Sequence, residues 1–404
     1  MRAPQSEVAR WYQPFERFAG SEAAGGIVLL ACTAVALAWA NSPWGGAYEA
    51  ILHRSLYVGG TQLMLELSVH EWINDGLMAV FFFVVGLEIK REMLVGELAS
   101  IRQASLPIAG AIGGMIVPAL IYAALNAGGP GARGWGIPVA TDIAFALGVL
   151  ALLGPRIPLA LRVFLAAVAI VDDIGAVLVI ALFYTASISS IGLALAGVLL
   201  ATLIALNWSG VRNPIPYILL GLVLWLAVLL SGIHATIAGV MLAMTIPARA
   251  VRPDETPLLE RLERALHAPV AFLVVPLFAL ANAGVRLGGA SAGSHSMAIM
   301  GGVALGLVLG KPLGITLASR LAVRFRIAAL PDGVSWRLLQ GVSWLGGIGF
   351  TMSLFVGALA FTDAALLDSA KIGVLLASCA AAIMGWLVLR STRKNGQPGG
   401  LDPR

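Results

Sequence analysis

Long runs of apolar residues dominate the chain, and short polar segments separate them. About twelve of these runs are ~15–22 residues long, close to the length that a helix needs to cross a bilayer. They lie near residues 25–40, 72–87, 104–125, 137–153, 159–181, 189–207, 215–230, 233–246, 269–284, 298–318, 337–358 and 371–389. The pattern therefore predicts an all-α polytopic membrane protein with about twelve transmembrane helices.

Composition agrees with a membrane protein. Of the 404 residues, 59% are hydrophobic and only 12% are charged, and the mean hydropathy is +0.90. An ordinary soluble domain has about twice that share of charged residues. The formal net charge of +5 is spread over the loops, so it does not indicate binding to nucleic acid.

The distribution of basic residues predicts the topology. Of the 26 Lys and Arg residues, 21 lie in the tails and in the loops between even and odd spans. Four lie on the opposite side, and Lys311 falls inside the tenth span. Because basic residues concentrate in cytoplasmic loops, both termini are expected in the cytoplasm. The first span is then expected to be an uncleaved transmembrane helix and not a signal peptide.

The whole chain, residues 1–404, is expected to form a single transmembrane domain with a flexible cytoplasmic tail at 390–404. The inward loop from Ala248 to His267 is expected to contain a short amphipathic helix, because four of its leucines share one helical face. These are Leu258, Leu259, Leu262 and Leu266.

The outward loop at 50–69 has too many polar residues to cross the membrane. Gly59-Gly60 stands between β-prone flanks, which predicts a β-hairpin with a two-residue turn. An isolated hairpin is marginally stable in water, so pairing with a second copy would form a homodimer. An irregular loop is the alternative.

Two adjacent aspartates are the most informative polar residues. Asp172 and Asp173 follow nine apolar residues, 163–171, and precede eleven uncharged ones, 174–184. Two carboxylates at mid-bilayer cost roughly 5–7 kcal/mol before any partner is found. Their oxygens are typical ligands of a hard cation or a proton, so the pair indicates an ion-transport site. A purely architectural ion pair is the alternative.

Two further charged residues lie within predicted transmembrane spans. Asp142 follows Thr141 in the fourth span, and Lys311 lies beside Pro312 in the tenth. A lysine in hydrocarbon needs a carboxylate partner, and a pair at ~4 Å gains about 4 kcal/mol at an effective dielectric of ~20. Asp172 or Asp173 is the candidate partner of Lys311. Asp142 and Lys311 are equally well explained by stabilisation of broken helix ends.

Those breaks are predicted in the fourth and eleventh spans. The fourth contains Gly136, Pro138 and the Thr141-Asp142 step, and the eleventh contains the glycines Gly346, Gly347 and Gly349. Unwinding there leaves half-helices with partial charges at their ends, which an aspartate facing two N-termini and a lysine facing two C-termini would compensate. Spans 3–5 and 10–12 then form the inverted repeats of a secondary transporter, with helices 4 and 11 crossing mid-membrane.

Seven stretches in order along the chain give a specific resemblance. They are WINDGLMAVFFFVVGLEIKRE (72–92), PVATDIAFALGVL (138–150), VDDIGA (171–176), SGIHATIAGV (231–240), PLFALANAGV (276–285), GKPLGI (310–315) and GGIGFTMSLF (346–355). With these motifs the chain resembles the NhaA family of bacterial Na⁺/H⁺ antiporters.

The resemblance implies roles for the embedded residues. Asp173 matches the principal Na⁺/Li⁺ ligand, and Asp172 matches the neighbour that shares the ion or pairs with the membrane lysine, Lys311. Asp142 matches the acid at the crossing of the broken helices, with Thr141 beside it as an oxygen donor.

The resemblance also implies an ion path and a pH response. Asp75 matches a residue on the path, and His234 matches a position linked to pH dependence, although a packing histidine is equally consistent with the sequence. The residues matching the pH-responsive funnel are Glu88, Arg91, Glu92 and Glu263. A solvated helix end with local ion pairs is the alternative for the cluster around Glu88.

The expected function is electrogenic, pH-regulated exchange of cytoplasmic Na⁺ or Li⁺ for external H⁺. Na⁺ and protons would compete for the same carboxylate oxygens, and the aspartate pair would titrate as one coupled unit. No cofactor is expected, and the partners are the transported ions and membrane lipid. A Na⁺-coupled organic-solute symporter is the alternative. An enzyme is not expected, because His70-Glu71 is followed by Asn74 where a zinc-protease helix needs a second histidine.

Overall fold

The computed structural model describes residues 24–60, 63–154, 157–185, 189–250, 255–286 and 293–392. Within these ranges, eight helices are long and apolar enough to cross a membrane, and three bent helix pairs raise the number to eleven. The prediction of an all-α polytopic membrane protein is confirmed. The C-terminal tail at 393–404 and the hairpin tip at 61–62 lie outside the described residues.

The helices follow the predicted spans closely. Their bounds in chain order are Ala24–Ala40, α2 Gly45–Leu52, α3 Val69–Glu71, η1 Trp72–Leu77, α4 Met78–Val95, η2 Glu97–Ala99, α5 Ile101–Asn126, η3 Pro130–Val139, α6 Ile143–Leu152, α7 Leu159–Phe183, α8 Ser190–Trp208, α9 Pro214–Ser231, α10 Ile237–Thr245, α11 Leu258–Pro269, η5 Val270–Val274, α12 Val275–Asn282, α13 Ser294–Leu305, η6 Gly306–Gly310, α14 Lys311–Arg324, α15 Trp336–Gly346, α16 Phe350–Ala360 and α17 Ala364–Ser391.

The eighth predicted span is shorter than expected. Only the nine residues of α10 are helical, and the chain from Gly232 to Thr236 is irregular. Gly232 ends α9 in the left-handed region with φ 81°, a conformation that glycine adopts without steric cost. The apolar run at 233–246 is therefore a half-length helix with an irregular entry.

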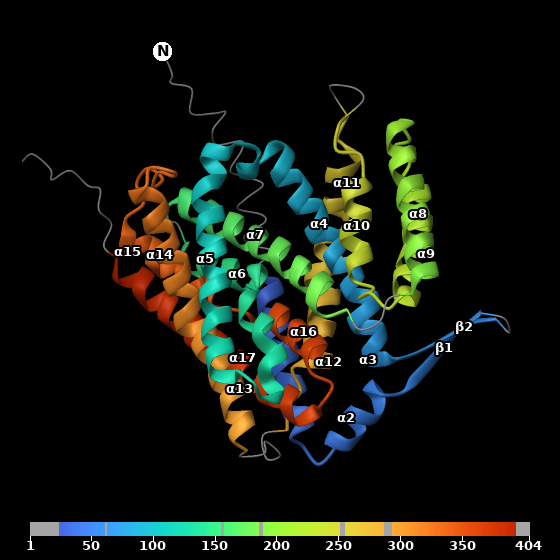
Figure 1. Ribbon diagram of the computed structural model, residues 1–404, viewed down its shortest axis with the longest axis horizontal. Helices are drawn as coiled ribbons and strands as arrows, with labels where there is room; N and C mark the ends of the chain where they lie inside the picture. The colour runs from blue at the N-terminus through green and yellow to red at the C-terminus, as the bar shows by residue number, and fades with distance from the viewer. Residues whose placement is uncertain are drawn as a thin grey trace, which may run out of the picture.

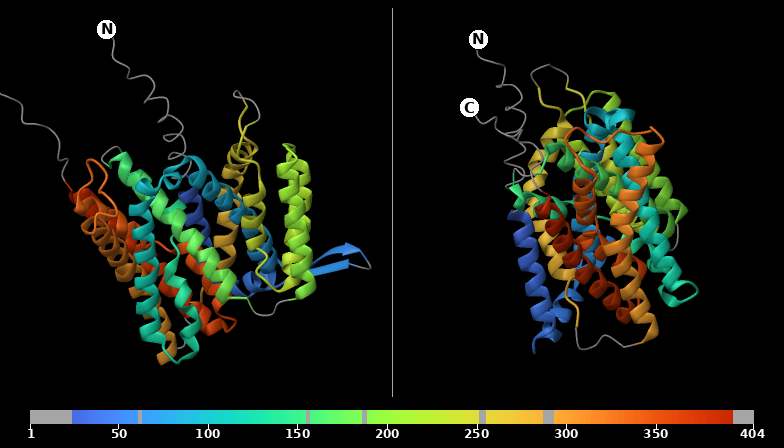
Figure 2. Two further views of the ribbon diagram at one scale, coloured as in Figure 1. Left: turned by 45° about the horizontal axis from the view of Figure 1, so that its top comes forward. Right: turned by 90° about the vertical axis from the view of Figure 1, so that its left-hand side faces the viewer.

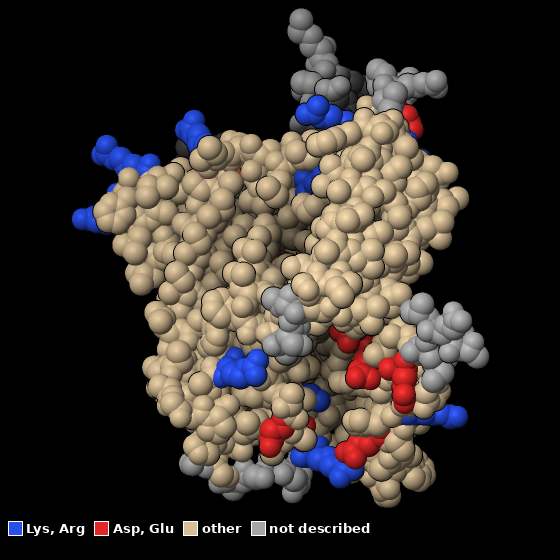
Figure 3. Space-filling model, turned by 45° about the vertical axis from the view of Figure 1, so that its right-hand side comes forward, with Lys and Arg blue, Asp and Glu red and all other residues tan. Residues whose placement is uncertain are grey.

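One face of the molecule has a broad uncharged band. On the face drawn in Figure 3, Lys and Arg lie along the upper rim and again in the lower half, where most of the acidic residues lie, with uncharged surface between. The exposed large hydrophobic residues include Ile112, Ile116, Leu120, Leu219 and Leu222, on α5 and α9. Such a surface is unfavourable in water and matches a lipid-facing belt.

The helices form two packed groups. One contains α4, α8, α9, α10 and α11 around a small core that includes Leu87, Leu203 and Leu224. The other contains α5, α7 and α13 to α17 around a larger core that includes Leu161, Leu307 and Phe355. Figures 1 and 2 show α8 and α9 at one edge of the bundle, with α5 and α13 to α17 on the other side.

The two predicted breaks cross each other. The η3/α6 pair bends by 46° and the α15/α16 pair by 44°. The backbone N–H of Asp142 donates to the carbonyl of Ile348 at 2.7 Å, and the Ser353 hydroxyl donates to the carbonyl of Ile137 at 2.7 Å. The breaks thus supply polar partners for each other where lipid offers none.

The glycines of the second break allow close packing. All three have negative φ or are helical, so their backbone does not require glycine. A Cβ at Gly347 would lie 2.5 Å from the carbonyl oxygen of Leu307, and one at Gly349 would lie 2.2 Å from Ser353 Oγ. The break therefore packs directly on η6, the turn that precedes Lys311.

The inward amphipathic helix is confirmed as α11, and Leu258 and Leu259 on its apolar face are buried. This helix continues through η5 into α12, so loop and ninth span form one helical unit, 258–282. Lys371 is one of the four basic residues that the sequence assigned to the outer side, in a loop. It is buried in α17, because that helix already begins at Ala364.

The β-hairpin is present, but the predicted turn is wrong. Strands β1 (Ser55–Gly60) and β2 (Leu63–Ser68) pair antiparallel with Gly60 opposite Leu63, so residues 61–62 connect them and both glycines lie in β1. This register places Tyr57 opposite Glu66, and the Tyr57 hydroxyl donates to Glu66 Oε1 at 2.9 Å. The hairpin projects from the bundle below α8 and α9 (Figure 1).

Close contact between α5 and α14 predicts a sharp steric effect at Gly314. A Cβ there would lie 2.1 Å from the carbonyl oxygen of Gly113, so Gly314→Val must push the helices apart. We expect a loss of about 1–3 kcal/mol or more, seen as a lower midpoint of thermal unfolding in detergent. Gly301→Val in the same span is the control, because nothing lies within 4 Å of its Cβ position. Equal midpoints for the two variants would contradict the packing.

Candidate ion-binding site

The aspartate pair lies in the middle of α7. Asp172 and Asp173 are buried, with 0% and 2% of their surface exposed, and the neighbouring positions are apolar. Helix α7 packs on α5, α6, α4 and α15, so the pair faces the interior of the bundle. Both carboxyl groups therefore depend on protein groups for any compensation.

Asp172 is the partner of Lys311, which the sequence alone left open. The Lys311 Nζ lies 2.9 Å from Asp172 Oδ2, and both side chains are fully buried. The Thr141 hydroxyl lies 2.7 Å from the same oxygen and 2.9 Å from the carbonyl of Gly346. Asp172 thus has one oxygen held by a cation and a hydroxyl.

Lys311 also compensates a helix end. It is the first residue of α14, directly after the π-helical turn η6, and its Nζ donates to the carbonyl of Val139 as well as to Asp172. Val139 ends η3, the first half of a broken helix. The expectation that lysine faces two C-termini holds for one of them; at the other, the Gly346 carbonyl accepts from Thr141 instead.

Asp142 bridges the two N-termini at the crossing. Its Oδ1 accepts from the backbone N–H of Phe145 at 3.0 Å, which caps α6. Its Oδ2 accepts from the backbone N–H of Thr351 at 3.1 Å and from the Thr351 hydroxyl, at the start of α16. One buried carboxylate therefore compensates both positive helix ends, as the sequence predicted.

Two carboxylate oxygens are left over at the centre. Asp172 Oδ1 and Asp173 Oδ1 are buried and have no hydrogen-bond partner within the described part of the chain. Buried polar atoms normally have a partner, so each exception calls for an explanation. Lys311, the lysine at this site, already forms an ion pair with Asp172 Oδ2. Adjacent unpartnered oxygens are suited to a small hard cation or to protons.

A cavity of about 500 Å³ lies near this pair. Its lining includes Ile170, three residues before Asp173, and Ile143, next to Asp142, but none of the embedded aspartates. Glu88, Arg91 and Glu92 also line it, so the structure brings these three predicted residues together around one cavity.

Glu263 joins the same cluster through Arg91. Arg91 pairs with Glu263 Oε1, and its second terminal nitrogen lies 3.2 Å from Glu92 Oε1. Glu92 in turn accepts from the backbone N–H of Glu97 at 3.1 Å. The Arg91–Glu263 pair links the middle of α11 to the last turns of α4. Because Arg91 is 39% exposed, each pair contributes little stability by itself.

Asp75 and His234 lie apart from the aspartate pair. Asp75 is half-buried in η1, and its backbone carbonyl accepts from Trp225 Nε1 at 2.8 Å. His234 Nε2 lies 2.9 Å from the carbonyl of Tyr184, just after α7. Eleven residues of helix separate Tyr184 from Asp173, which is about 16 Å along the axis. The geometry of His234 thus fits the packing interpretation as well as a pH role.

Two side chains that contact the broken helices were missed in the sequence. Ser378 of α17 accepts from the backbone N–H of Phe350, and the Tyr184 hydroxyl donates to the carbonyl of Arg133 at 2.7 Å. Burial raises the pKa of Tyr184 to about 12, so it remains a neutral donor at physiological pH. Single polar residues in apolar runs carry no pattern that reveals such distant partners.

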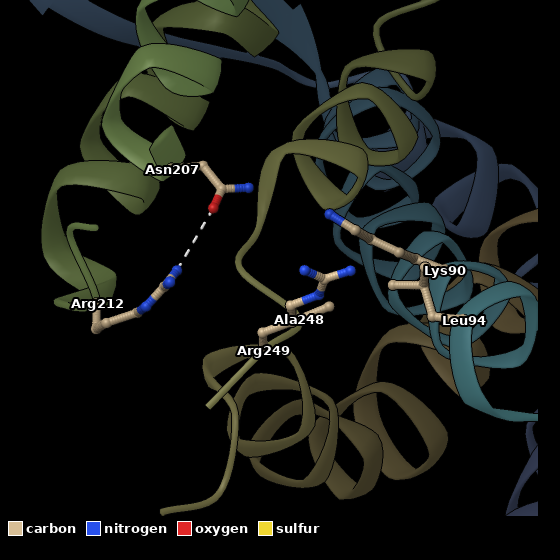
Figure 4. A pocket seen from close by; sticks show the side chains of 6 residues that line it. All are labelled: Lys90, Leu94, Asn207, Arg212, Ala248 and Arg249. Atoms are coloured by element: carbon tan, nitrogen blue, oxygen red, sulfur yellow. Dashed lines mark hydrogen bonds between the residues drawn. The ribbon is translucent and has the colours of Figure 1, made fainter. Parts of the chain in front are cut away.

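A second pocket, of about 240 Å³, lies near the end of α4 (Figure 4) and is distinctly basic. Lys90 Nζ donates to the carbonyls of Met244 and Ile246 at 2.6 Å each, which compensates the C-terminus of α10. The remaining lining residues are Leu94, Asn207, Arg212, Ala248 and Arg249. Lys90 has a structural role here, distinct from the aspartate site.

Comparisons with known proteins agree with this geometry. The family model Na⁺/H⁺ antiporter 1 matches residues 16–389. The chain belongs to this family. It is 53% identical to a Na⁺/H⁺ antiporter NhaA 2 of Pseudomonas syringae pv. syringae over 97% of this chain and 99% of the relative. It is 50% identical to the Na⁺/H⁺ antiporter NhaA of Acidithiobacillus ferrooxidans (95% and 99% covered) and 48% identical to that of Oleidesulfovibrio alaskensis (98% and 97%).

Membership in the Na⁺/H⁺ antiporter 1 family confirms the resemblance read from the motifs. All seven quoted stretches lie within the matched residues 16–389. The family is one of transporters and not of enzymes. The relatives' names also agree with the choice of a transporter that uses ions without a cofactor.

The Asp172–Lys311 pair predicts a compensating double mutant. Lys311→Met should destabilise the protein by about 3–5 kcal/mol, because it leaves a buried carboxylate without its cation. Adding Asp172→Asn removes that charge and should restore most of the stability, giving a favourable coupling in a double-mutant cycle. The measurement is thermal unfolding of the four proteins in the same detergent. Additive losses would show that the two charges do not interact.

Proposed function

We propose that this protein exchanges Na⁺ for H⁺ across a membrane at the pair Asp172 and Asp173. The observation that carries the proposal is that two neighbouring residues, Asp172 and Asp173, each have a buried carboxylate oxygen, Oδ1, without a hydrogen-bond partner among the described residues. Membership in the Na⁺/H⁺ antiporter 1 family and the names of close relatives support it. Carboxylate oxygens bind Na⁺ only when deprotonated, so one ion excludes the other.

Each residue of the site has a distinct part. Asp173 is the principal ligand of Na⁺ or Li⁺, because none of its oxygens is committed to Lys311. Asp172 contributes its free oxygen, and its other oxygen is held by Lys311 and Thr141. Asp142 holds the crossing together through two helix N-termini. Asp75 lies on the path at the opposite end from the cavity.

Exchange then follows from competition and alternating access. With the site open to the cavity, a low proton concentration lets Na⁺ load onto the pair. With the site open to the other side, a high proton concentration displaces Na⁺. Two adjacent carboxyl groups can carry more than one proton for each Na⁺, which makes the exchange electrogenic. The inward proton gradient drives Na⁺ or Li⁺ out of the cell.

The cavity is the proposed site of pH regulation. Glu88, Glu92 and Glu263 surround Arg91 in one opening, so their protonation changes the local charge balance. Because α11 is continuous with α12, a change at Glu263 can act on the whole ninth span. His234 is assigned to the same pH response through its contact with Tyr184 at the end of α7.

Location and assembly complete the proposal. We assign the protein to a bacterial inner membrane, and the bias of basic residues supports both termini and the cavity on the cytoplasmic side. The projecting hairpin then faces outward, where Leu56, Tyr57 and Val58 are exposed on β1. A two-stranded sheet with exposed edges gains stability from a second copy, so the hairpins pair in a homodimer.

The direct test is the collapse of a pH gradient in everted membrane vesicles on adding Na⁺, Li⁺ or K⁺. We expect Na⁺ and Li⁺, but not K⁺, to dissipate the gradient, increasingly so between about pH 6.5 and 8.5 as protons leave the carboxylates. Asp173→Asn should abolish the response. Asp363→Asn, an exposed helix-capping aspartate on α17, is the matched control and should behave as wild type.

The same assay separates the alternative function. A Na⁺-coupled organic-solute symporter would leave the gradient intact on addition of Na⁺ alone. An absent response with the protein present in the membrane would therefore reject the antiporter and favour the symporter. An active Asp173→Asn variant would instead reject the assignment of the ion site.

A further inference from the structure

Three polar side chains meet where the second span begins and the ninth ends. His70 of α3 places Nε2 3.1 Å from Asn282 Oδ1, and Asn282 Nδ2 donates to Asn74 Oδ1 at 2.8 Å. Asn74 Nδ2 closes the ring, 3.3 Å from His70 Nδ1 and 3.2 Å from Nε2. Asn282 is fully buried, and the other two are half-buried. The triad joins α3 and η1 to the last residue of α12.

The direction of each hydrogen bond is fixed by one backbone carbonyl. Asn282 Nδ2 also donates to the carbonyl of Phe278 at 3.0 Å, and a carbonyl can only accept. The Asn282 Oδ1 therefore faces His70, and Asn74 must turn its Oδ1 to Asn282 and its Nδ2 to His70. The neutral ring that donates through Nε2 to Asn282 and accepts through Nδ1 from Asn74 satisfies both neighbours. Asn74 Nδ2 also lies 3.4 Å from Asn282 Oδ1, so the three side chains form one network.

A protonated His70 does not fit this triad. The imidazolium carries N–H groups on both nitrogens, so its Nδ1–H would point at the Asn74 amide donor. Its ionisable neighbours are His53, Lys371 and Glu71. His53 is stacked on it with ring centroids 6.4 Å apart, and Lys371 is buried in α17 with Asp368 as its nearest acid. Neither favours a second positive charge.

Glu71 is the one acid among these neighbours, and its carboxylate is already hydrogen-bonded to Ser68. Its Oε2 accepts from the backbone N–H of Ser68 at 2.7 Å and from the Ser68 hydroxyl at 2.8 Å, in a capping box at the start of α3. Turning toward His70 would break both bonds. Protonation of His70 is therefore opposed by the donor-donor contact with Asn74 and by the nearby Lys371, and Glu71, held in its capping box, offsets this only weakly.

We propose that His70 is a proton-sensitive positioning residue that holds η1 against α12 when neutral and releases it when protonated. Segment η1 contains Asp75, and α12 belongs to the same helical unit as Glu263, so the junction couples the assigned ion path to the cavity cluster. Its place on the outer side depends on the topology proposed above; the triad itself does not. Acid on that side loosens the junction.

The test is hydrogen–deuterium exchange of the wild-type protein in lipid nanodiscs, corrected for the intrinsic effect of pH. From about pH 8 to about pH 5.5, across the ordinary titration of histidine, protection of residues 69–77 and 278–284 should fall about tenfold. His70→Gln should abolish this response, because glutamine supplies one donor and one acceptor but does not titrate. Its protection should stay near the wild-type value at high pH.

His53→Gln is the matched control, since His53 is the stacked neighbour with its own bond to the carbonyl of Glu49. It should keep the pH response. A response retained in His70→Gln, or lost in His53→Gln, would overturn the assignment to His70, as would wild-type protection that does not change with pH. The readout involves no Na⁺ and no transport, so it is independent of the antiport assay.

Discussion

The structure depends on the compensation of charge where water is absent. Four ionisable side chains and four interrupted helix ends meet inside one bundle, and each would be costly alone. Asp142 accepts hydrogen bonds from the two helix N-termini. Lys311 donates to the carbonyl at one helix C-terminus, and the Thr141 hydroxyl donates to the carbonyl at the other. Lys311 then has only enough charge for one carboxylate of the adjacent pair.

The proposed exchange depends on an imbalance of charge at the site. Asp172 is compensated by Lys311, whereas Asp173 has no cation among the described residues that contacts it. In lipid, a group in that situation needs a proton or a metal ion. A site that is one positive charge short can therefore exchange one kind of cation for another. The same architecture with a second lysine would be a stable but inert pair.

Much of this arrangement was predictable from the sequence, because membrane burial makes each polar residue informative. The apolar runs gave the helices, and Gly346, Pro138 and Asp142 indicated both breaks and their compensation. The choice of Asp172 over Asp173 for Lys311 was not predictable, since adjacent residues on a helix differ only in the direction that they face. That direction depends on how α7 and α14 pack.

Other features depended on contacts that no local pattern encodes. The hairpin register pairs Tyr57 with Glu66 and moves the turn away from Gly59-Gly60. The eighth span is short because Gly232 ends α9 and the chain as far as Thr236 stays irregular. His70, Asn74 and Asn282 come from segments about 210 residues apart and meet only in the folded bundle.

The proposed exchange requires that Na⁺ and protons compete for Asp172 and Asp173. Isothermal titration of the purified protein with Na⁺ at alkaline pH, in buffers of different ionisation enthalpy, measures the protons released on binding. We expect Na⁺ binding to release protons in the wild type, whereas Asp173→Asn should neither bind Na⁺ nor release protons. Na⁺ binding without proton release, or unchanged binding in Asp173→Asn, would contradict it.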